Sequence, residues 1–306
     1  MLNNVSIKSL LAASLCAMGL SFQALAADVA IVIHGGAGTI LKKNMTPERE
    51  KAYVEKLTEA VKKGYALLQS GVDGETAVVE TIQVLEQSPL FNAGIGAVYT
   101  FDGEHELDAS MMHGGTLNAG AVAGVKTIAS PIAAAQAVME HSPHVMLSGE
   151  GAEEFALSRG MEPVDNHIFD TERRYKALEK ARERILKAGI AYGGQQGNER
   201  IGTVGAVVID KQGNLVAGTS TGGMTAKRYG RIGDSPVIGA GTWADNSSCA
   251  VSATGHGEYF IRYHVAADIC SRMKYTGVSL DEAANTVIND VLVEAGGDGG
   301  IIAIDH

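Results

Sequence analysis

The sequence predicts a mixed α+β protein with two packed β-sheets, and three observations support this class. Short apolar, strand-like runs gather near the start of each half of the chain, and amphipathic segments with helix caps follow them. A turn-forming cluster at 210–214 separates two β-prone runs, 204–209 and 215–221, which indicates a hairpin. The 306 residues are 45% hydrophobic and 20% charged, which allows a large core.

The first half begins with a buried strand at 29–33. Thr46-Pro47-Glu48 then supplies a cap, a proline at the first helical position and an acidic first turn, so a helix begins there and ends at Gly71. Its predicted apolar stripe is Val54, Leu57, Val61 and Leu68. Asp73 caps a second helix, which closes at Ser88-Pro89.

Further elements follow from the same signals. The turn at 102–104 precedes a strand at 107–112, and a small-residue strand follows at 119–125. Three more helices are predicted to begin at Ser130, Ser148 and Thr171. After the hairpin we expect strands at 236–242 and 249–254, a helix at 258–273, a helix with a capping box at Ser279 and Glu282, and a last strand at 301–304.

Charge excludes some classes of partner. The chain has 25 basic and 35 acidic residues, for a net charge of -10, which argues against nucleic acid and anionic membranes. The nine histidines are scattered without ligand spacing, so no catalytic metal is expected.

Residues 1–26 have the pattern of a cleavable signal peptide. Lys8 gives a basic start, 10–20 is a short apolar core, and Ala24-Leu25-Ala26 is an A-x-A site before Ala27. The apolar run is too short to span a bilayer. We therefore expect a secreted or periplasmic protein.

Cysteine use is sparse. Cys16 leaves with the signal peptide, so Cys249 and Cys270 remain. They could pair in an oxidising compartment, but one lies in a strand-like and the other in a helix-like apolar run, so two buried, unpaired thiols are favoured.

Gly202-Thr203 lies where a polar, Gly-rich segment at 192–200 meets the strand at 204–209. If this peptide bond is cut, Thr203 gains a free α-amine beside its own hydroxyl. Such an amine titrates near 7.7–8.0, so it can act as a base near neutral pH. One residue then supplies both nucleophile and base. Glycine before it leaves room for the bond to bend toward attack.

The surrounding motifs resemble one family. They include His34-Gly35-Gly36-Ala37-Gly38, the run 90–98, the run 202–207, the run 218–224, Gly230-Arg231-Ile232-Gly233-Asp234-Ser235-Pro236, and Ala253-Thr254-Gly255-His256-Gly257-Glu258. In this order they resemble the plant-type L-asparaginase and isoaspartyl peptidase family, which are N-terminal-nucleophile hydrolases. The resemblance covers nearly all of the chain after the first strand.

This resemblance implies a four-layer αββα sandwich that cleaves itself before Thr203. The implied subunits are an α subunit, 27–202, and a β subunit, 203–306, together one structural domain, assembled as an (αβ)₂ heterotetramer. The implied activity is hydrolysis of β-aspartyl dipeptides and L-asparagine to release L-aspartate. Gly202 and the pair Gly222-Gly223 depart from the glycosylasparaginase branch, which favours the peptidase and asparaginase activities.

The resemblance also implies roles for single residues. Thr203 is the nucleophile, Thr221 tunes it, and Asn92 lies in a loop that faces it. Thr254 and Gly255 form the oxyanion hole and contribute to substrate binding. The other implied substrate-binding residues are Arg231, Gly233, Asp234 and Gly257. A guanidinium suits the substrate carboxylate and a carboxylate suits its ammonium.

The same family holds a structural sodium ion with main-chain carbonyls of one loop. The corresponding residues here are Leu85, Glu86, Ser88, Phe91, Ala93 and Ile95. No cofactor is implied for catalysis.

Two other functions stay open from the residues. Gly218-Thr219-Ser220-Thr221-Gly222 fits the G-x-S-x-G pattern of a serine esterase using Ser220, although that elbow needs a helix directly after the serine. The chain could also be a secreted, non-processing scaffold that binds amino acids through Arg231 and Asp234. Family members continue with a further strand after the equivalent of 301–306, so we expect a C-terminal strand to be missing and one sheet edge to be unpaired.

Overall fold

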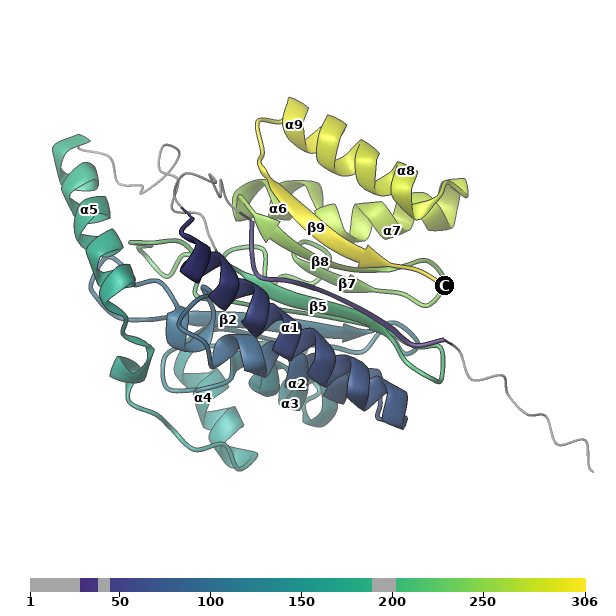
Figure 1. The fold of residues 1–306 in the computed structure, drawn as a ribbon, viewed down its shortest axis with the longest axis horizontal. Coiled ribbons are helices and arrows are strands. Elements are labelled where there is room, and N and C mark those ends of the chain that lie inside the picture. Colours follow the sequence, from purple (N-terminus) through teal and green to yellow (C-terminus); the bar gives the residue numbers. More distant parts are fainter. Residues whose placement is uncertain (1–27, 38–44, 189–201) are drawn as a thin grey trace, which may run out of the picture.

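The computed structural model describes residues 28–37, 45–188 and 202–306. The predicted signal peptide, the segment at 192–200 and Gly38 lie outside these ranges. The described residues form a mixed α+β fold with two sheets (Figure 1). Within the described ranges, no helix is both long enough and apolar enough to cross a membrane.

The larger sheet has six strands in the order β1-β5-β6-β2-β3-β4. Their bounds are β1 Ala30–His34, β2 Leu107–His113, β3 Ala119–Val125, β4 Met146–Ser148, β5 Val204–Ile209 and β6 Leu215–Thr221. All neighbours are antiparallel except β3 and β4. The predicted hairpin is confirmed as β5 and β6, which lie between β1 and β2. The start of β5, and Thr203 before it, therefore lies between β1 of the first half of the chain and β6 of the second half.

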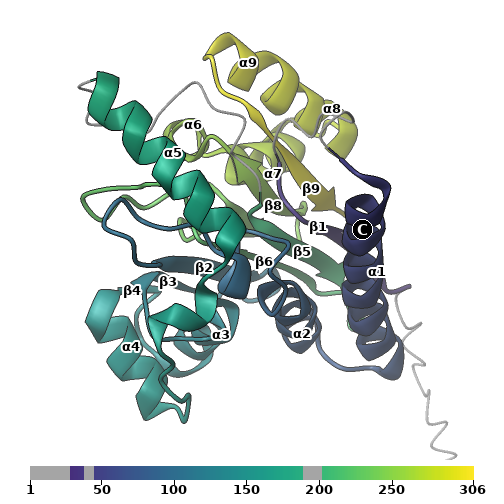
Figure 2. The ribbon, with the colours of Figure 1, turned by 60° about the vertical axis from the view of Figure 1, so that its left-hand side comes forward.

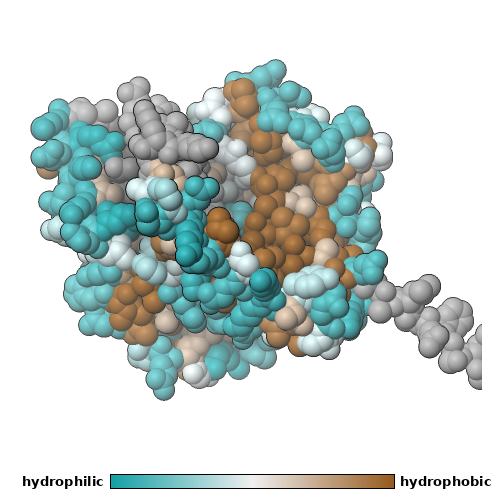
Figure 3. Space-filling view, in the orientation of Figure 1, coloured by the Kyte–Doolittle hydropathy of each residue, from teal (hydrophilic) through white to brown (hydrophobic). Residues whose placement is uncertain are grey.

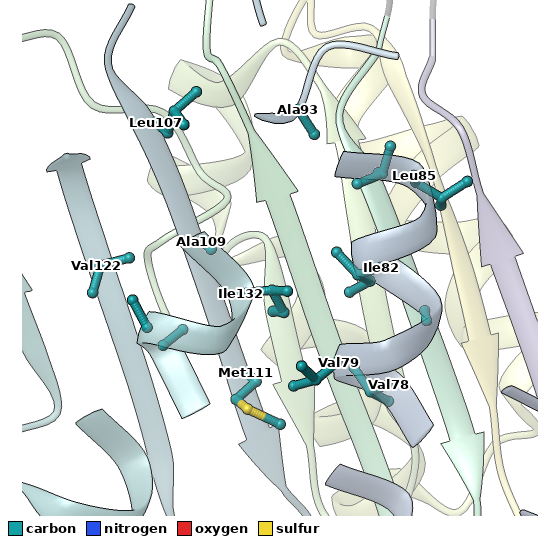
Figure 4. Packing of buried hydrophobic residues seen from close by; sticks show 14 of the residues in the cluster. Val78, Val79, Ile82, Leu85, Ala93, Leu107, Ala109, Met111, Val122 and Ile132 are labelled. Atoms are coloured by element: carbon teal, nitrogen blue, oxygen red, sulfur yellow. The ribbon is translucent and has the colours of Figure 1, made fainter. Parts of the chain in front are cut away.

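Three helices cover one face of this sheet: α1 Pro47–Ser70, α2 Gly74–Glu86 and α3 Pro131–His141 (Figure 1). The predicted caps are confirmed, because Thr46 accepts from the N–H of Arg49 and Asp73 accepts from that of Thr76. Figure 4 shows the resulting core, in which Ile82 of α2 and Ile132 of α3 lie above β2 and β6. The predicted apolar stripe of α1 is wrong in one position, since Val54 is 57% exposed.

The smaller sheet has the order β7-β8-β9 and packs on the other face of the large sheet. Its strands are β7 Thr242–Ala244, β8 Ala250–Gly255 and β9 Gly299–Ile304. The helices after β8 are α6 Gly257–Tyr263, α7 Val265–Thr276, α8 Leu280–Asn285 and α9 Leu292–Glu294, with a π-helical turn at Thr286–Val291. The remaining elements are α4 Gly149–Ser158, α5 Glu172–Ala188 and the 3₁₀ turns η2 Gly94–Gly96 and η3 Asn166–Phe169. Figure 2 shows α5 crossing the molecule apart from α1, α2 and α3.

Two predicted elements are wrong. The expected strand at 236–241 is a series of turns, in which the N–H of Val237 bonds to the carbonyl of Asp234, and only 242–244 is extended. The expected helix at 258–273 breaks at His264, whose φ is 49°. The first turn of α7 donates its N–H groups to the carbonyls of residues 239 and 240, which redirects the chain. Strand β4 was not predicted, since three residues carry little pattern.

The predicted unpaired thiols are also wrong. Cys249 and Cys270 form a disulfide with Cα atoms 5.3 Å apart, and both residues are buried. Cys249 lies just before β8, and α7 packs directly on this strand, so strand and helix bring the two sulfurs together. The sequence patterns predict the strand and the helix, but they do not predict this contact.

We expect the double substitution Cys249→Ala and Cys270→Ala to lower the free energy of unfolding by about 3 kcal/mol, because the bond closes a loop with a sequence separation of 21 residues. Chemical denaturation with and without a reductant measures it. The reductant should destabilise the native sequence and leave the double variant unchanged. Equal stability of native protein and variant without reductant would contradict the assignment.

Strand β9 lies at an edge of the smaller sheet, next to β8 on one side. Figure 3 shows apolar side chains gathered over β9 and β1, where Val32 is 38% exposed. Exposed strand edges of this kind favour association with other chains.

Candidate active site

The side chains between the two sheets change from apolar to polar along the strands. The side chains of β6 that face the smaller sheet run from Leu215 and Ala217 through Thr219 to Thr221. Strand β2 repeats this order with Met112, Ser110 and Asp108. The sheets are thus held together by an apolar cluster at one end, by hydroxyl groups in the middle, and by the residues of the candidate site at the other end.

Thr203 and Thr221 lie side by side at this end. The register that pairs Val204 with Ser220 places Thr203 opposite Thr221, and their Oγ1 atoms are 3.0 Å apart. The N–H of Gly223 donates to Thr221 Oγ1 at 3.0 Å. Thr221 therefore has one accepted hydrogen bond and can exchange the other with the Thr203 hydroxyl, as expected for a residue that tunes a nucleophile.

The Gly202–Thr203 bond is enclosed on two sides. The main-chain N–H of Asn92 donates to the Gly202 carbonyl at 2.9 Å. Gly202 has a φ of 134°, and a Cβ there would collide with Asn92; a Cβ on Gly36 would collide with Gly202 in turn. A donor aimed at this carbonyl can stabilise the negative charge that develops when a hydroxyl attacks it.

We expect Gly202→Ala to slow cleavage of this bond about tenfold, because the added methyl group is strained at this φ and against Asn92. The time course of fragment formation by intact mass measures it. Because Gly202 is only the end of the first fragment once the bond is cut, activity per processed molecule should stay close to that of the unsubstituted chain. Unchanged cleavage would mean that the observed backbone geometry is not required.

Asn92 contacts the site through both its main chain and its side chain. Its side chain accepts from the N–H of Val98 at 2.9 Å and donates to the carbonyl of Gly223 at 2.7 Å. Its own carbonyl accepts from Gly222 at 2.9 Å. The Asn92 side chain thus ties together two glycine-rich loops, and its main-chain N–H group contacts the cleavage site.

Thr254 and Gly255 end β8 beside the loop that carries Gly36. Thr254 is 6% exposed, and its Oγ1 accepts from the N–H of Ala37 at 3.0 Å. The hydroxyl proton of Thr254 remains available to an incoming oxyanion. Gly255 has a φ of 156°, and a Cβ there would meet the Asp298 carbonyl at 2.5 Å, so this turn requires glycine.

Four of the six predicted substrate-binding residues, Arg231, Gly233, Asp234 and Gly257, are brought together. A Cβ on Gly257 would lie 2.7 Å from Asp234 Oδ1 and 2.9 Å from Arg231 Nη2, and one on Gly233 would lie 2.8 Å from Arg231 Nη1. The two glycines therefore leave open the space beside a guanidinium and a carboxylate.

Sequence reasoning missed Glu258, which holds Arg231 in place. Arg231 Nε and Nη2 donate to its two carboxylate oxygens at 3.0 and 3.1 Å, a bidentate pair. Burial alone would raise the pKa of Glu258, but the Arg231 guanidinium outweighs this effect and lowers that pKa. An acidic residue directly after a glycine at the start of a helix is too common a pattern to have identified it.

Asp234 is 5% exposed, and its Oδ2 has no hydrogen-bond partner among the described residues. Burial raises the pKa of Asp234 to about 7, although the Arg231 guanidinium acts the other way. A buried carboxylate with a free oxygen is poised to accept a cationic group such as an ammonium.

A buried hydroxyl network lies directly beneath these residues. His34 Nε2 is 3.0 Å from Ser252 Oγ, which is 2.7 Å from Thr219 Oγ1. The chain continues from Thr219 through Thr242 to Ser110 at 2.6 and 2.8 Å. Burial lowers the pKa of His34 to about 4, although the Thr203 carbonyl raises it, so the ring is neutral near pH 7. The network thus supports the site without a net charge.

Ser220 does not form an esterase elbow. It lies within β6, is fully buried, and donates to Glu86 Oε1 at 2.6 Å on the face covered by helices. The described residues directly after β6, 222–230, form turns and not the helix that an elbow needs. The residues that meet Thr203 lie on the opposite face of the sheet.

The loop predicted to hold sodium is compact. A Cβ on Gly96 would collide with the carbonyl of Phe91, and one on Gly94 with that of Glu86. Carbonyl oxygens therefore point into the loop, where only glycine fits, and neutral oxygen donors suit a hard cation. Other carbonyls are used by turns, since those of Leu85 and Ala93 accept from Ser88 and Gly96.

A threonine hydroxyl beside a glycine carbonyl, a donor aimed at that carbonyl, and a guanidinium close to a carboxylate are the groups that an N-terminal-nucleophile type of hydrolase site requires. The family model described as asparaginase matches residues 27–306. The chain belongs to this family.

Three relatives illustrate the similarity. The isoaspartyl peptidases of Salmonella typhimurium and Escherichia coli are each 52% identical to the chain over 90% of it, covering 88% and 86% of the relatives. The isoaspartyl peptidase/L-asparaginase of Rattus norvegicus is 41% identical over 91% of the chain and 80% of the relative. These relatives favour neither the esterase nor the binding scaffold.

Proposed function

We propose that the chain is a self-activating threonine hydrolase that cleaves β-aspartyl dipeptides and L-asparagine and releases L-aspartate. The observation that carries this is the contact of the Thr203 and Thr221 hydroxyls next to a Gly202 carbonyl that accepts from Asn92. The names of the relatives support the substrate class.

Self-cleavage follows from this geometry. The Thr203 oxygen attacks the Gly202 carbonyl carbon, and the Asn92 N–H stabilises the charge on its oxygen. The C–N bond breaks and the nitrogen takes a proton, which leaves an ester between Gly202 and the Thr203 oxygen. Water hydrolyses the ester, restores the hydroxyl and leaves a free amine on Thr203.

Substrate hydrolysis then uses the freed amine as the base. The Thr203 hydroxyl attacks the side-chain carbonyl of the substrate, while Thr254 and Gly255 stabilise the oxyanion. Arg231 binds the substrate α-carboxylate, and Asp234 binds its α-ammonium. The amine of Thr203 gives its proton to the leaving group, and water releases L-aspartate from the β-aspartyl ester.

The assembly and location are part of the same proposal. The sequence of helix, sheet, sheet and helix in Figure 1 supports the αββα sandwich. Cleavage before Thr203 yields 27–202 and 203–306 as the two subunits, and the family expectation for their assembly is an (αβ)₂ heterotetramer. A disulfide is typical of exported proteins, so it supports a secreted or periplasmic location. The glycine-lined carbonyl loop at 85–95 supports structural sodium.

The test uses the chain lacking residues 1–26. Intact mass after incubation should show two fragments with a new N-terminus at Thr203. The processed protein should release L-aspartate from L-asparagine and from a β-aspartyl dipeptide, and not from the matching α-aspartyl dipeptide. A single uncut chain without release of aspartate would overturn the proposal.

A further inference from the structure

Asp108 lies at the same level between the sheets as the two reacting threonines. Strand β2 pairs Asp108 with Thr221, the residue whose hydroxyl meets Thr203. Its side chain is fully buried. A carboxylate in this position is close to the chemistry, yet neither the motifs nor the proposed mechanism gives it a role.

The carboxylate is only partly satisfied by hydrogen bonds. Asp108 Oδ1 accepts from the N–H of Gly124 at 2.8 Å, whereas Oδ2 has no hydrogen-bond partner among the described residues. The Nζ of Lys227 lies 3.8 Å from Oδ2. Because an isolated buried carboxylate is costly, this ammonium group is the charge that offsets it.

Lys227 is buried as deeply as Asp108. Its side chain is 1% exposed, and Nζ also donates to the main-chain carbonyl of Glu106 at 2.9 Å and lies 3.7 Å from the Glu106 carboxylate. Lysine is rarely buried to this degree without such partners. A Cβ on Gly223 would lie 3.1 Å from Nζ, so the ammonium is next to the loop that bonds to Thr221 and Asn92.

Lys227 belongs to the loop that connects Thr221 to Arg231 and Asp234. Its backbone N–H bonds to the Met224 carbonyl, and its own carbonyl accepts from Phe101 at 2.9 Å. The side chain and the main chain thus both fasten this loop to the first half of the chain. A displaced Lys227 would move the guanidinium and the carboxylate that face the substrate.

Charges reach Asp234 from three directions. The positive charge of Arg231, on the same loop, favours the ionised form of Asp234. The negative charges of Glu258 on α6 and Asp108 on β2 disfavour that form. His256 Nε2 lies 3.4 Å from Glu258 Oε2, and this interaction contributes to the lowered pKa of Glu258. Lys227 carries the opposite charge 3.8 Å from Asp108 Oδ2 on β2.

We propose that Asp108 and Lys227 are positioning residues of the hydrolase site: the pair fixes the loop of Arg231 and Asp234 to β2, and its near-zero net charge keeps Asp234 available as the anion that meets the substrate ammonium. This inference rests on the proposed function and adds two residues to the same site.

The test compares Asp108→Asn, Lys227→Met and the double variant in the full processed enzyme. The measurement is kcat/KM for a β-aspartyl dipeptide against pH. Removing the negative charge of Asp108 should move the acidic limb down by about one pH unit, and removing the positive charge of Lys227 should move it up by about as much. The double variant should return toward the unsubstituted enzyme.

Lys126→Met is the matched control, since Lys126 forms an exposed ion pair with Glu104 at 2.6 Å. Its profile should coincide with that of the unsubstituted enzyme. A merely structural pair would lower kcat/KM at every pH without moving the limb. If the limbs of all variants coincide with the control, the proposal is overturned.

A second measurement does not need activity. For each variant, the free energy of unfolding is measured between pH 5 and pH 9 with and without the additional substitution Asp234→Asn. The difference between the two isolates the ionisation of Asp234. We expect this ionisation to shift down in Asp108→Asn and up in Lys227→Met, even in chains that fail to process. No difference would overturn the charge coupling. Absence of aspartate release by the unsubstituted chain would instead count against the proposed function.

Discussion

Thr203→Ala is expected to abolish both self-cleavage and hydrolysis. Alanine lacks the hydroxyl that attacks the Gly202 carbonyl, so the bond stays intact and no free amine forms at residue 203. Nucleophile and base are thereby lost in one substitution. We expect a single mass for the uncut chain and a loss of aspartate release of about 10⁴-fold or more.

Two controls make this result specific to Thr203. Thr203→Ser keeps a hydroxyl and should still be cleaved. Ser220→Ala removes a hydroxyl from the adjacent strand position that contacts Glu86 on the other face of the sheet, so cleavage should continue. Cleavage of Thr203→Ala, or loss of cleavage in Ser220→Ala alone, would contradict the assignment of the nucleophile.

Local signals in the sequence predicted most elements of the fold. The caps at Thr46, Asp73 and Ser279 each formed the predicted hydrogen bond to a backbone N–H. Failures occurred where contacts between distant segments decide the structure. The break at His264 depends on carbonyls of residues 239 and 240, and the disulfide depends on α7 packing against β8. No local pattern records these contacts.

In the candidate site, too, some features could be predicted from the sequence and others could not. The glycine-rich motifs named Thr203, Thr221, Thr254, Arg231 and Asp234, and the structure brings these residues together in two neighbouring groups. The motifs did not reveal that Asn92 acts through its main chain, that Glu258 holds Arg231, or that Asp108 lies beside Thr221. Those facts depend on strand register and loop packing, which residue types alone do not encode.

Asp234→Asn is expected to lower kcat/KM for β-aspartyl dipeptides by about 100-fold near pH 8, because a hydrogen bond between two charged groups is replaced by a neutral one. Most of this loss should appear in KM, since Asp234 contacts the substrate ammonium and not the reacting carbonyl. Asparagine is nearly isosteric with aspartate, so the fold should be retained. Steady-state kinetics on the processed variant measure the effect.

The ionisation of Asp234 determines how kcat/KM changes with pH. Burial raises the pKa of Asp234 to about 7, so below pH 7 the carboxyl is increasingly neutral and binds an ammonium poorly. The Thr203 amine, which titrates near 7.7–8.0, must also be neutral to act as a base. Well below pH 7, kcat/KM should therefore fall by up to about 100-fold per pH unit in the unsubstituted enzyme and about tenfold in Asp234→Asn. Equal slopes would show that Asp234 does not titrate in this range.

The raised pKa of Asp234 has opposite effects on substrate binding and on stability: as pH rises, substrate binding improves and the folded state loses stability. Because the folded-state pKa of Asp234 lies above its unfolded value, the folded chain binds more protons, and the free energy of unfolding falls as pH rises toward and through about 7. Asp234→Asn should lose less stability over that range. The substitution would then stabilise the empty enzyme near pH 8 while weakening substrate binding, as expected where a buried charge is retained for function. Thermal unfolding of both proteins at pH 5 and pH 8 measures this difference, and equal losses would contradict it.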